Sequence, residues 1–268
     1  MSTAALSLPD HRSNSFARTF RIFLTEARFE FVRLLRTRAF SLAVIGFPVI
    51  FYVFFGLIMN RGEHIGSVSV AKYMLAGYAV FGMVGAALFG IGGGLASELS
   101  TGWLELKRAS PMPPLAYLIA KCCSAAAFGL VIVSLLTLLG ITVAHVSITL
   151  SEYTRMMALT LVGTIPFACL GMVVALFVPF NATPGVINMI YLPMSFCGGL
   201  WLPIMLLPHM LQKFALLLPT YHLSQLVLDC FGYASAGTAL SHWLGLLGFT
   251  VVMLGLAGVA YRRLQQNS

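Results

Sequence analysis

Charged residues are scarce in this chain. They make up 9% of its 268 residues, only eight residues are acidic, and 59% are hydrophobic. A soluble domain carries about 25% charged residues, which it needs to cover its surface. This composition excludes an ordinary soluble enzyme and a disordered chain, and it indicates an integral membrane protein.

Sequence motifs for catalysis and cofactor binding are missing as well. The chain contains no GxxxxGK[ST] phosphate loop, no HExxH zinc motif and no GxSxG nucleophile motif, so it lacks these routes to ATP binding, metal catalysis and acyl transfer. Its six histidines are scattered and its five cysteines form no CxxC pair, which argues against a metal site and a disulfide framework. We therefore expect no enzyme activity, no metal and no cofactor bound by this chain.

The hydrophobic residues are concentrated in six runs that contain no Asp, Glu, Lys or Arg. Each run is long enough to cross about 30 Å of hydrocarbon as a helix, whereas barrel strands of about ten alternating residues are not seen. We therefore expect an all-α integral membrane protein with six transmembrane helices. The runs are Phe40–Met59, Tyr73–Ser97, Cys122–Val146, Met156–Phe180, Val186–Leu207 and Leu240–Tyr261.

The basic residues predict the orientation in the membrane. The net charge of +8 does not indicate nucleic-acid binding, because seven of the sixteen basic residues precede residue 40 and the others are scattered. Basic residues prefer cytoplasmic segments. With the N-terminus in the cytoplasm, twelve of the sixteen lie inside, and only Arg61, Lys72, Arg155 and Lys213 lie outside. Both termini are then cytoplasmic.

The segment 15–38 has the pattern of an amphipathic helix. Its apolar residues recur every three or four positions, so they share one face, and most of its arginines fall on the other face. Such a helix can lie in the headgroup plane with its arginines toward anionic lipid. It is either a simple topological anchor or a helix that also contacts a cytoplasmic partner. We divide the chain into residues 1–39, a tail with this helix, and a transmembrane domain, 40–268. The apolar face comprises Phe16, Phe20, Phe23, Ala27, Phe31 and Leu34.

The cytoplasmic loop 98–114 has features of a docking segment. Gly102 can end the helix that arrives from the membrane, and the prolines from Pro111 onward can end a short helix that follows it. An exposed Trp103 in such a helix suits insertion into a groove on another protein. The alternative is a solvated loop whose tryptophan lies at the membrane interface.

The fifth hydrophobic run is followed by a second unusual segment. Two glycines and a proline, Gly198, Gly199 and Pro203, lie near the outer end of the run, and Pro219 then divides the apolar stretch 208–233. Neither half of that stretch is long enough to span a membrane. We expect a pair of short helices that dip in from the outer face, buried in protein or facing water.

Together, the loop and the outer segment resemble the ABC-2 family of ABC transporter permeases. The family's loop reads roughly Glu-x-x-x-Gly-x-Leu-Glu followed by Ser/Thr-Pro, and Ser100 stands where the family often has a second acid. The segment from Gly199 to Pro219 resembles the family's glycine-proline region, and the resemblance covers nearly the whole chain. The matching loop residues are Glu98, Gly102, Leu104, Glu105, Ser110 and Pro111.

The resemblance implies an ATP-driven exporter in the bacterial cytoplasmic (inner) membrane. Two permease subunits, identical or homologous, would form the pore, and separate ATPase subunits would bind ATP and Mg. The substrate would be an amphipathic small molecule, a drug or a lipid-like molecule, and membrane lipid would surround the pore. The implied coupling residues are Glu98, Gly102, Trp103, Leu104, Glu105, Lys107, Arg108, Ser110 and Pro111. For the translocation path or outer gate, we single out Asn188, Phe196, Gly198, Gly199, Trp201 and Pro203.

Other classes of membrane protein remain as alternatives. An ion-coupled secondary transporter or channel would need internal repeats or charges within its spans, and neither is clear in the sequence. A membrane-embedded enzyme would need a polar catalytic group at one membrane face, for which His222, Ser224 and Asp229 are the densest candidates. A scaffold protein is a further alternative.

Overall fold

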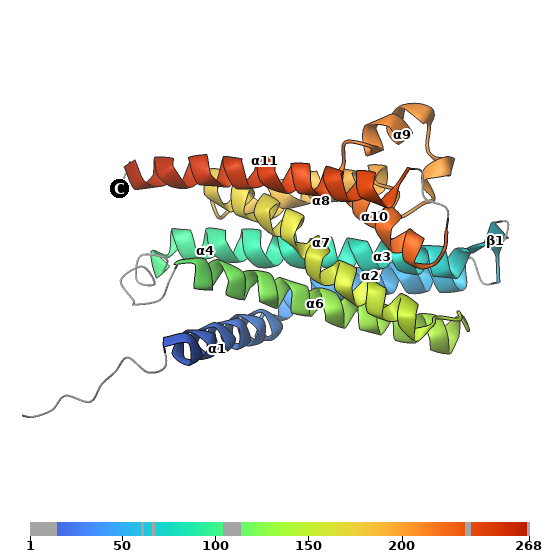
Figure 1. Cartoon of the computed structure of the whole chain (residues 1–268), viewed down its shortest axis with the longest axis horizontal. Coiled ribbons are helices and arrows are strands. Elements are labelled where there is room, and N and C mark those ends of the chain that lie inside the picture. Colours follow the sequence, from blue (N-terminus) through green and yellow to red (C-terminus); the bar gives the residue numbers. More distant parts are fainter. Residues whose placement is uncertain (1–14, 60–61, 66–67, 104–113, 234–236, 267–268) are drawn as a thin grey trace, which may run out of the picture.

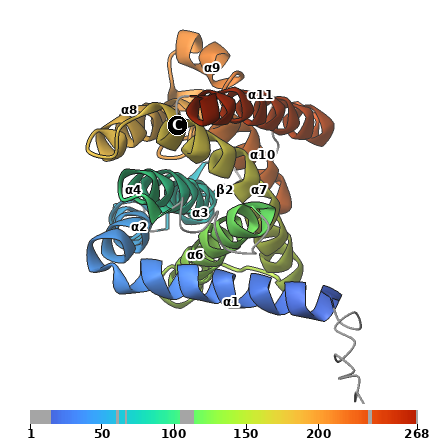
Figure 2. The same cartoon turned by 90° about the vertical axis from the view of Figure 1, so that its left-hand side faces the viewer.

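The computed structural model describes residues 15–59, 62–65, 68–103, 114–233 and 237–266. These residues form an elongated bundle of helices (Figure 1). The helix α1 (Ser15–Arg36) lies across one end of the bundle (Figure 2). One two-residue antiparallel hairpin, β1 (His64–Ile65) with β2 (Val68–Ser69), departs from the expected all-α fold.

Five helices among the described residues are long and apolar enough to cross a membrane. Two of them contain a π-helical segment. The first comprises α2 (Arg38–Phe51) and the π-helix η1 (Tyr52–Ile58). The second comprises α3 (Val70–Ala87), the π-helix η2 (Leu88–Gly93) and α4 (Gly94–Ser100). The others are α6 (Pro114–Val143), α7 (Leu150–Phe177) and α11 (Ala239–Gln266).

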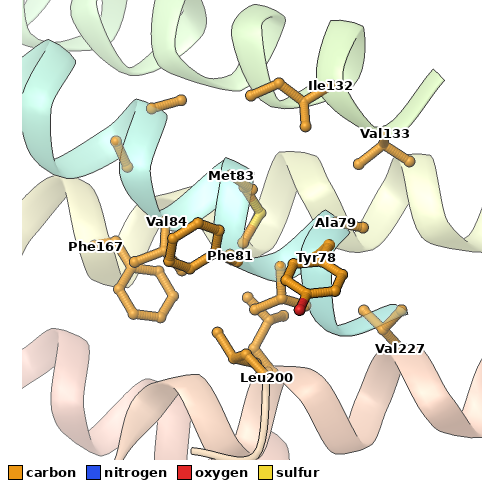
Figure 3. Packing of buried hydrophobic residues seen from close by; sticks show 14 of the residues in the cluster. Tyr78, Ala79, Phe81, Met83, Val84, Ile132, Val133, Phe167, Leu200 and Val227 are labelled. Atoms are coloured by element: carbon orange, nitrogen blue, oxygen red, sulfur yellow. The ribbon is translucent and has the colours of Figure 1, made fainter. Parts of the chain in front are cut away.

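The span from Val70 to Ser100 is the centre of the bundle, because 94% of its most apolar stretch is buried, against 28% for the first span and 17% for the last. A helix that is apolar on all sides is expected to be buried in this way. Figure 3 shows Met83 and Phe81 of α3 among side chains from neighbouring elements, including Ile132, Phe167 and Leu200.

The N-terminal helix is present where the sequence predicts it, but it ends at Arg36. Its inner face packs on α6, where the ring of Phe31 lies 5.0 Å from that of Phe128. Leu34 is buried, whereas Phe20 is 61% exposed, so the predicted apolar face extends beyond the protein contact. Thr37 separates α1 from α2, close to the expected boundary at residue 39. The division into two domains remains a prediction.

Helix α7 begins at Leu150, before the charge-free run that predicts it. Its first turn is stabilised by a capping box. The Thr149 hydroxyl accepts a hydrogen bond from the Glu152 amide at 3.2 Å, and the Glu152 carboxylate accepts one from the Thr149 amide at 2.7 Å. These bonds satisfy two amides that helix formation leaves unpaired, so a span can begin at a charged residue.

The prediction of a continuous fifth span over 186–207 is wrong. The helix there, α8, runs from Thr183 to Cys197. Fifteen residues make a helix of about 22 Å, less than the roughly 30 Å of hydrocarbon. The helix ends because Gly199 has a φ of +76°, which a helix cannot accommodate, and a 3-10 turn, η3 (Ile204–Leu206), follows. The expected count of six span-length helices is therefore not seen among the described residues.

Two short helices follow this turn, within the segment 208–233. They are α9 (His209–Ala215) and α10 (Pro219–Cys230). Pro219 is the first residue of α10, where its missing amide costs nothing. The Thr220 hydroxyl donates to the Met194 carbonyl at 2.8 Å, which fixes the start of α10 on α8. In Figure 1, α9 lies near the β1 end of the bundle, and α4 lies near the opposite end.

Candidate coupling site

Four charged side chains meet where α1, α4 and α6 come together. Glu30 and Arg33 come from α1, Glu98 from α4 and Lys121 from α6. Glu30, Glu98 and Lys121 are 1%, 3% and 2% exposed. We call these four residues the ion cluster. It connects parts of the chain that are up to 91 residues apart in sequence.

The charges of the ion cluster alternate and cancel. Glu98 Oε1 accepts from Arg33 Nη1 at 2.7 Å and from Lys121 Nζ at 2.9 Å. Glu30 Oε1 lies 3.3 Å from Lys121 Nζ, and Glu30 Oε2 lies 2.9 Å from Arg33 Nη2. The hydroxyl of Tyr117 donates to the second oxygen of Glu98. Each carboxylate therefore contacts both cations.

Such a cluster is stable only while it is complete. Removing charges from water costs several kcal/mol for each ion, and this cost is offset only by good pairing. A Cβ atom on Gly94 would lie 3.3 Å from Arg33 Nη2 and 3.4 Å from Lys121 Nζ. Glycine at this position therefore leaves room for both cations against α4, and the three helices are held together there.

The cluster is not predicted from the sequence, although the sequence contains one signal of it. Glu30 lies on the apolar face of the first helix, between Ala27 and Leu34 at helical spacing, and an acid in that position needs a buried partner. Lys121, one of the twelve basic residues predicted to be cytoplasmic, indicates by itself only the orientation in the membrane. Glu98, one of the predicted coupling residues, has its carboxylate buried inside the chain, and its role in coupling stays a prediction.

The loop itself is described only at its beginning. Helix α4 ends at Ser100, and Gly102 has a φ of +70°, so the expected break is present. Trp103, five residues after Glu98, is 48% exposed. The other expected coupling residues lie outside the described part of the chain. They are Leu104, Glu105, Lys107, Arg108, Ser110 and Pro111.

Five of the six expected path residues lie at the end of α8 and in the turn after it. Trp201 stacks on Phe51 of α2 with ring centroids 5.8 Å apart, and its ring lies nearly perpendicular to those of Phe81 and Phe196. Gly198 is needed there because a Cβ would lie 2.4 Å from the Thr220 hydroxyl.

The other members of this group differ in exposure. Gly199 and Pro203 are buried, while Phe196 is 37% exposed. Asn188 lies more than two turns earlier on α8 and is also exposed. Whether substrate passes these residues remains a prediction.

A sequence profile of the ABC-2 type transporter family matches residues 22–231. The chain belongs to the ABC-2 type transporter family. The chain is also 27% identical over 193 residues to a Bacillus subtilis (strain 168) protein named "Putative transport permease YvfS", which covers 72% of this chain and 78% of the relative. Membership makes the chain a multi-pass membrane permease and implies an ABC ATPase as a partner in general. The matched region contains the ion cluster, Trp103 and the turn after α8.

Proposed function

We propose that this ABC-2 permease is the membrane subunit of an ATP-driven exporter. A separate ATPase binds and hydrolyses ATP with Mg, and the permease moves an amphipathic small molecule, a drug or a lipid-like molecule out of the cytoplasm. Family membership and the absence of a phosphate-loop motif from the sequence support this division of labour.

The observation that carries the proposal is the position of Glu98. Its carboxylate is fixed to α1 and α6, and Trp103 is exposed five residues later in the chain. An ATPase can drive the permease only by binding one of its conformations better than another. In our proposal, the ATPase holds Trp103, and the ion cluster transmits the resulting shift of α4 to α1 and α6.

The pore in this proposal forms between two permease copies. Phe54 of η1 and Met189 of α8 are 50% and 78% exposed. In a membrane, either lipid or a second copy covers such side chains. Asn188 and Phe196, on the exposed part of α8, would then line the path between the copies, and the turn from Gly198 to Pro203 would form its outer gate.

The first test concerns Trp103. We expect Trp103→Ala to leave expression and membrane insertion unchanged but to weaken ATPase binding and uncouple ATP hydrolysis from transport. Aromatic anchors commonly contribute about 2 kcal/mol or more, which corresponds to roughly thirtyfold in affinity. ATPase co-purification and substrate efflux are measured in the same preparation.

The conservative variant Trp103→Phe separates anchoring from simple membrane contact. It keeps a large aromatic side chain, so we expect it to retain most of the binding. If Trp103→Ala showed wild-type co-purification and efflux, Trp103 would be no part of the coupling site and the loop would be a connector.

The second test concerns orientation in the bacterial inner membrane, with both termini cytoplasmic. In a variant without the five native cysteines, we expect Lys213→Cys on α9 to react with a membrane-impermeant thiol reagent in intact cells. Arg36→Cys on α1, also exposed, should react only after permeabilisation. The reverse pattern would invert the proposed topology.

A further inference from the structure

Two histidines face each other where α10 meets α11, at a place that the proposed function does not use. Nδ1 of His222 lies 3.0 Å from Nδ1 of His242, and Nε2 of His222 lies 3.0 Å from the Leu216 carbonyl. Leu216 directly follows α9, so the His222 ring connects the ends of three helices. We call this contact the histidine joint.

The geometry limits how many protons the joint can hold. A carbonyl oxygen only accepts hydrogen bonds, so Nε2 of His222 must carry a proton. The two Nδ1 atoms can then bond only if one of them carries a proton and the other does not. A second proton between them would place two donors and two positive rings at 3.0 Å, an arrangement that the repulsion between like charges disfavours.

The surrounding structure holds the two rings together. A Cβ on Gly245 of α11 would lie 2.5 Å from Nε2 of His222, so glycine is required where the ring meets that helix. His242 is 2% exposed. Tyr221 packs against both rings, with centroids 5.6 Å from His222 and 5.8 Å from His242.

The ionisable groups on the neighbouring helices have contacts of their own. Tyr73 of α3 interacts with Tyr221, Glu152 of α7 is paired with Lys72, and Tyr191 of α8 donates to the Phe81 carbonyl. Just after α9, the carbonyl of Leu216 meets the joint. In the described part of the chain, Asp229 of α10 forms no ion pair with His222. The ionisable side chains on α9 are His209 and Lys213.

We propose that the histidine joint is a proton-sensitive latch that fastens α9 and α10 to α11. With a single proton between the two Nδ1 atoms the latch is closed. When both rings are imidazolium it opens, and the segment 209–230 is released from α11. A metal site is a poorer explanation, because structural zinc takes four ligands and the described residues contain no group of three His, Cys, Asp or Glu side chains placed for a metal.

The direction of the pH effect follows from His222. Burial lowers the pKa of His222 below its usual 6.5, and the hydrogen bond to Leu216 opposes this shift without cancelling it. The closed state therefore binds fewer protons than the open state, so its stability rises with pH. The latch stabilises the closed state fully above about pH 6.5. This stabilisation is lost as the pH falls through the lowered pKa of His222.

Hydrogen exchange of the full chain in lipid nanodiscs at pH 7.5 and pH 5 tests the latch. After correction for intrinsic exchange, we expect protection of residues 209–230 to be clearly lower at pH 5 than at pH 7.5, because the open state binds protons that the closed state excludes. Equal protection at both pH values would overturn the proposal.

Two variants keep this test specific. In His242→Asn, the amide can donate or accept at the Nδ1 position, so a bond to His222 persists in either protonation state. We expect normal protection at pH 7.5 and no loss at pH 5. His209→Asn removes an exposed histidine from α9 and should leave the wild-type response intact. A pH response that survives in His242→Asn would also overturn the latch.

Discussion

Replacing Lys121 with methionine should destabilise the α4 end of the permease by about 3–5 kcal/mol, the usual cost of leaving a buried charge without its partner. Lys121 contacts both Glu30 and Glu98, and all three residues are almost completely buried. Methionine fills a similar volume but leaves two carboxylates with Arg33 as their shared cation. Thermal unfolding of the purified chain measures the loss, and ATPase co-purification should fall with it.

A matched lysine gives the control. Lys72 pairs with Glu152 at 2.7 Å, but the two side chains are 13% and 17% exposed. Water solvates these charges better, so Lys72→Met should cost much less, about 1 kcal/mol. Adding Glu98→Gln to Lys121→Met removes one uncompensated charge and should recover part of the stability. If both lysine variants cost the same, burial of the cluster would not explain its effect.

The second large effect is expected at Gly77 of α3. A Cβ at this position would lie 2.1 Å from the carbonyl oxygen of Leu200. That oxygen belongs to the backbone of the turn after α8, so it cannot move aside as a flexible side chain could. Gly77→Ala should therefore push the turn away from α3 and cost about 3 kcal/mol or more. Thermal unfolding measures this cost directly.

Gly46 provides the comparison, because it also lies inside a helix, in α2, and a Cβ there would meet nothing within 4 Å. Alanine is favoured over glycine in a helix by about 1 kcal/mol, so Gly46→Ala should be neutral or stabilising. A Gly77→Ala variant as stable as Gly46→Ala would show that the close approach of α3 and Leu200 does not exist in the protein.

The sequence predicts those parts of the structure that depend on local chemistry. Long apolar runs predict the five membrane-length helices of the described residues. Gly102 predicts the end of α4, and Pro219 predicts a break in the stretch 208–233, where α10 begins. The hydrophobic run does not predict the end of α8, because it continues to Leu207 without a charge. Its helix ends at the Gly198–Gly199 pair, where the chain turns back against α3, and a count of apolar residues does not register that turn.

The site was predicted only in part for a related reason. The break at Gly102 and the exposed position of Trp103 can be predicted from the loop, because both depend on neighbouring residues. Glu30 and Lys121 are 91 residues apart in sequence, and they pair because α1 and α6 come together in the fold. Nothing local indicates which cation meets which acid. The same holds for His222 and His242, which are 20 residues apart on different helices.

The ion cluster imposes an order on biosynthesis. Glu30 leaves the ribosome 91 residues before Lys121, an interval of about 5–20 s at ordinary rates of translation. During that time, the first helix cannot take its final place, because its acid has no lysine to meet. This ion pair can therefore fix the N-terminal helix on the bundle only after Lys121 of α6 has been synthesised. Packing of the N-terminal helix against α6 is thus a late step in the formation of the bundle.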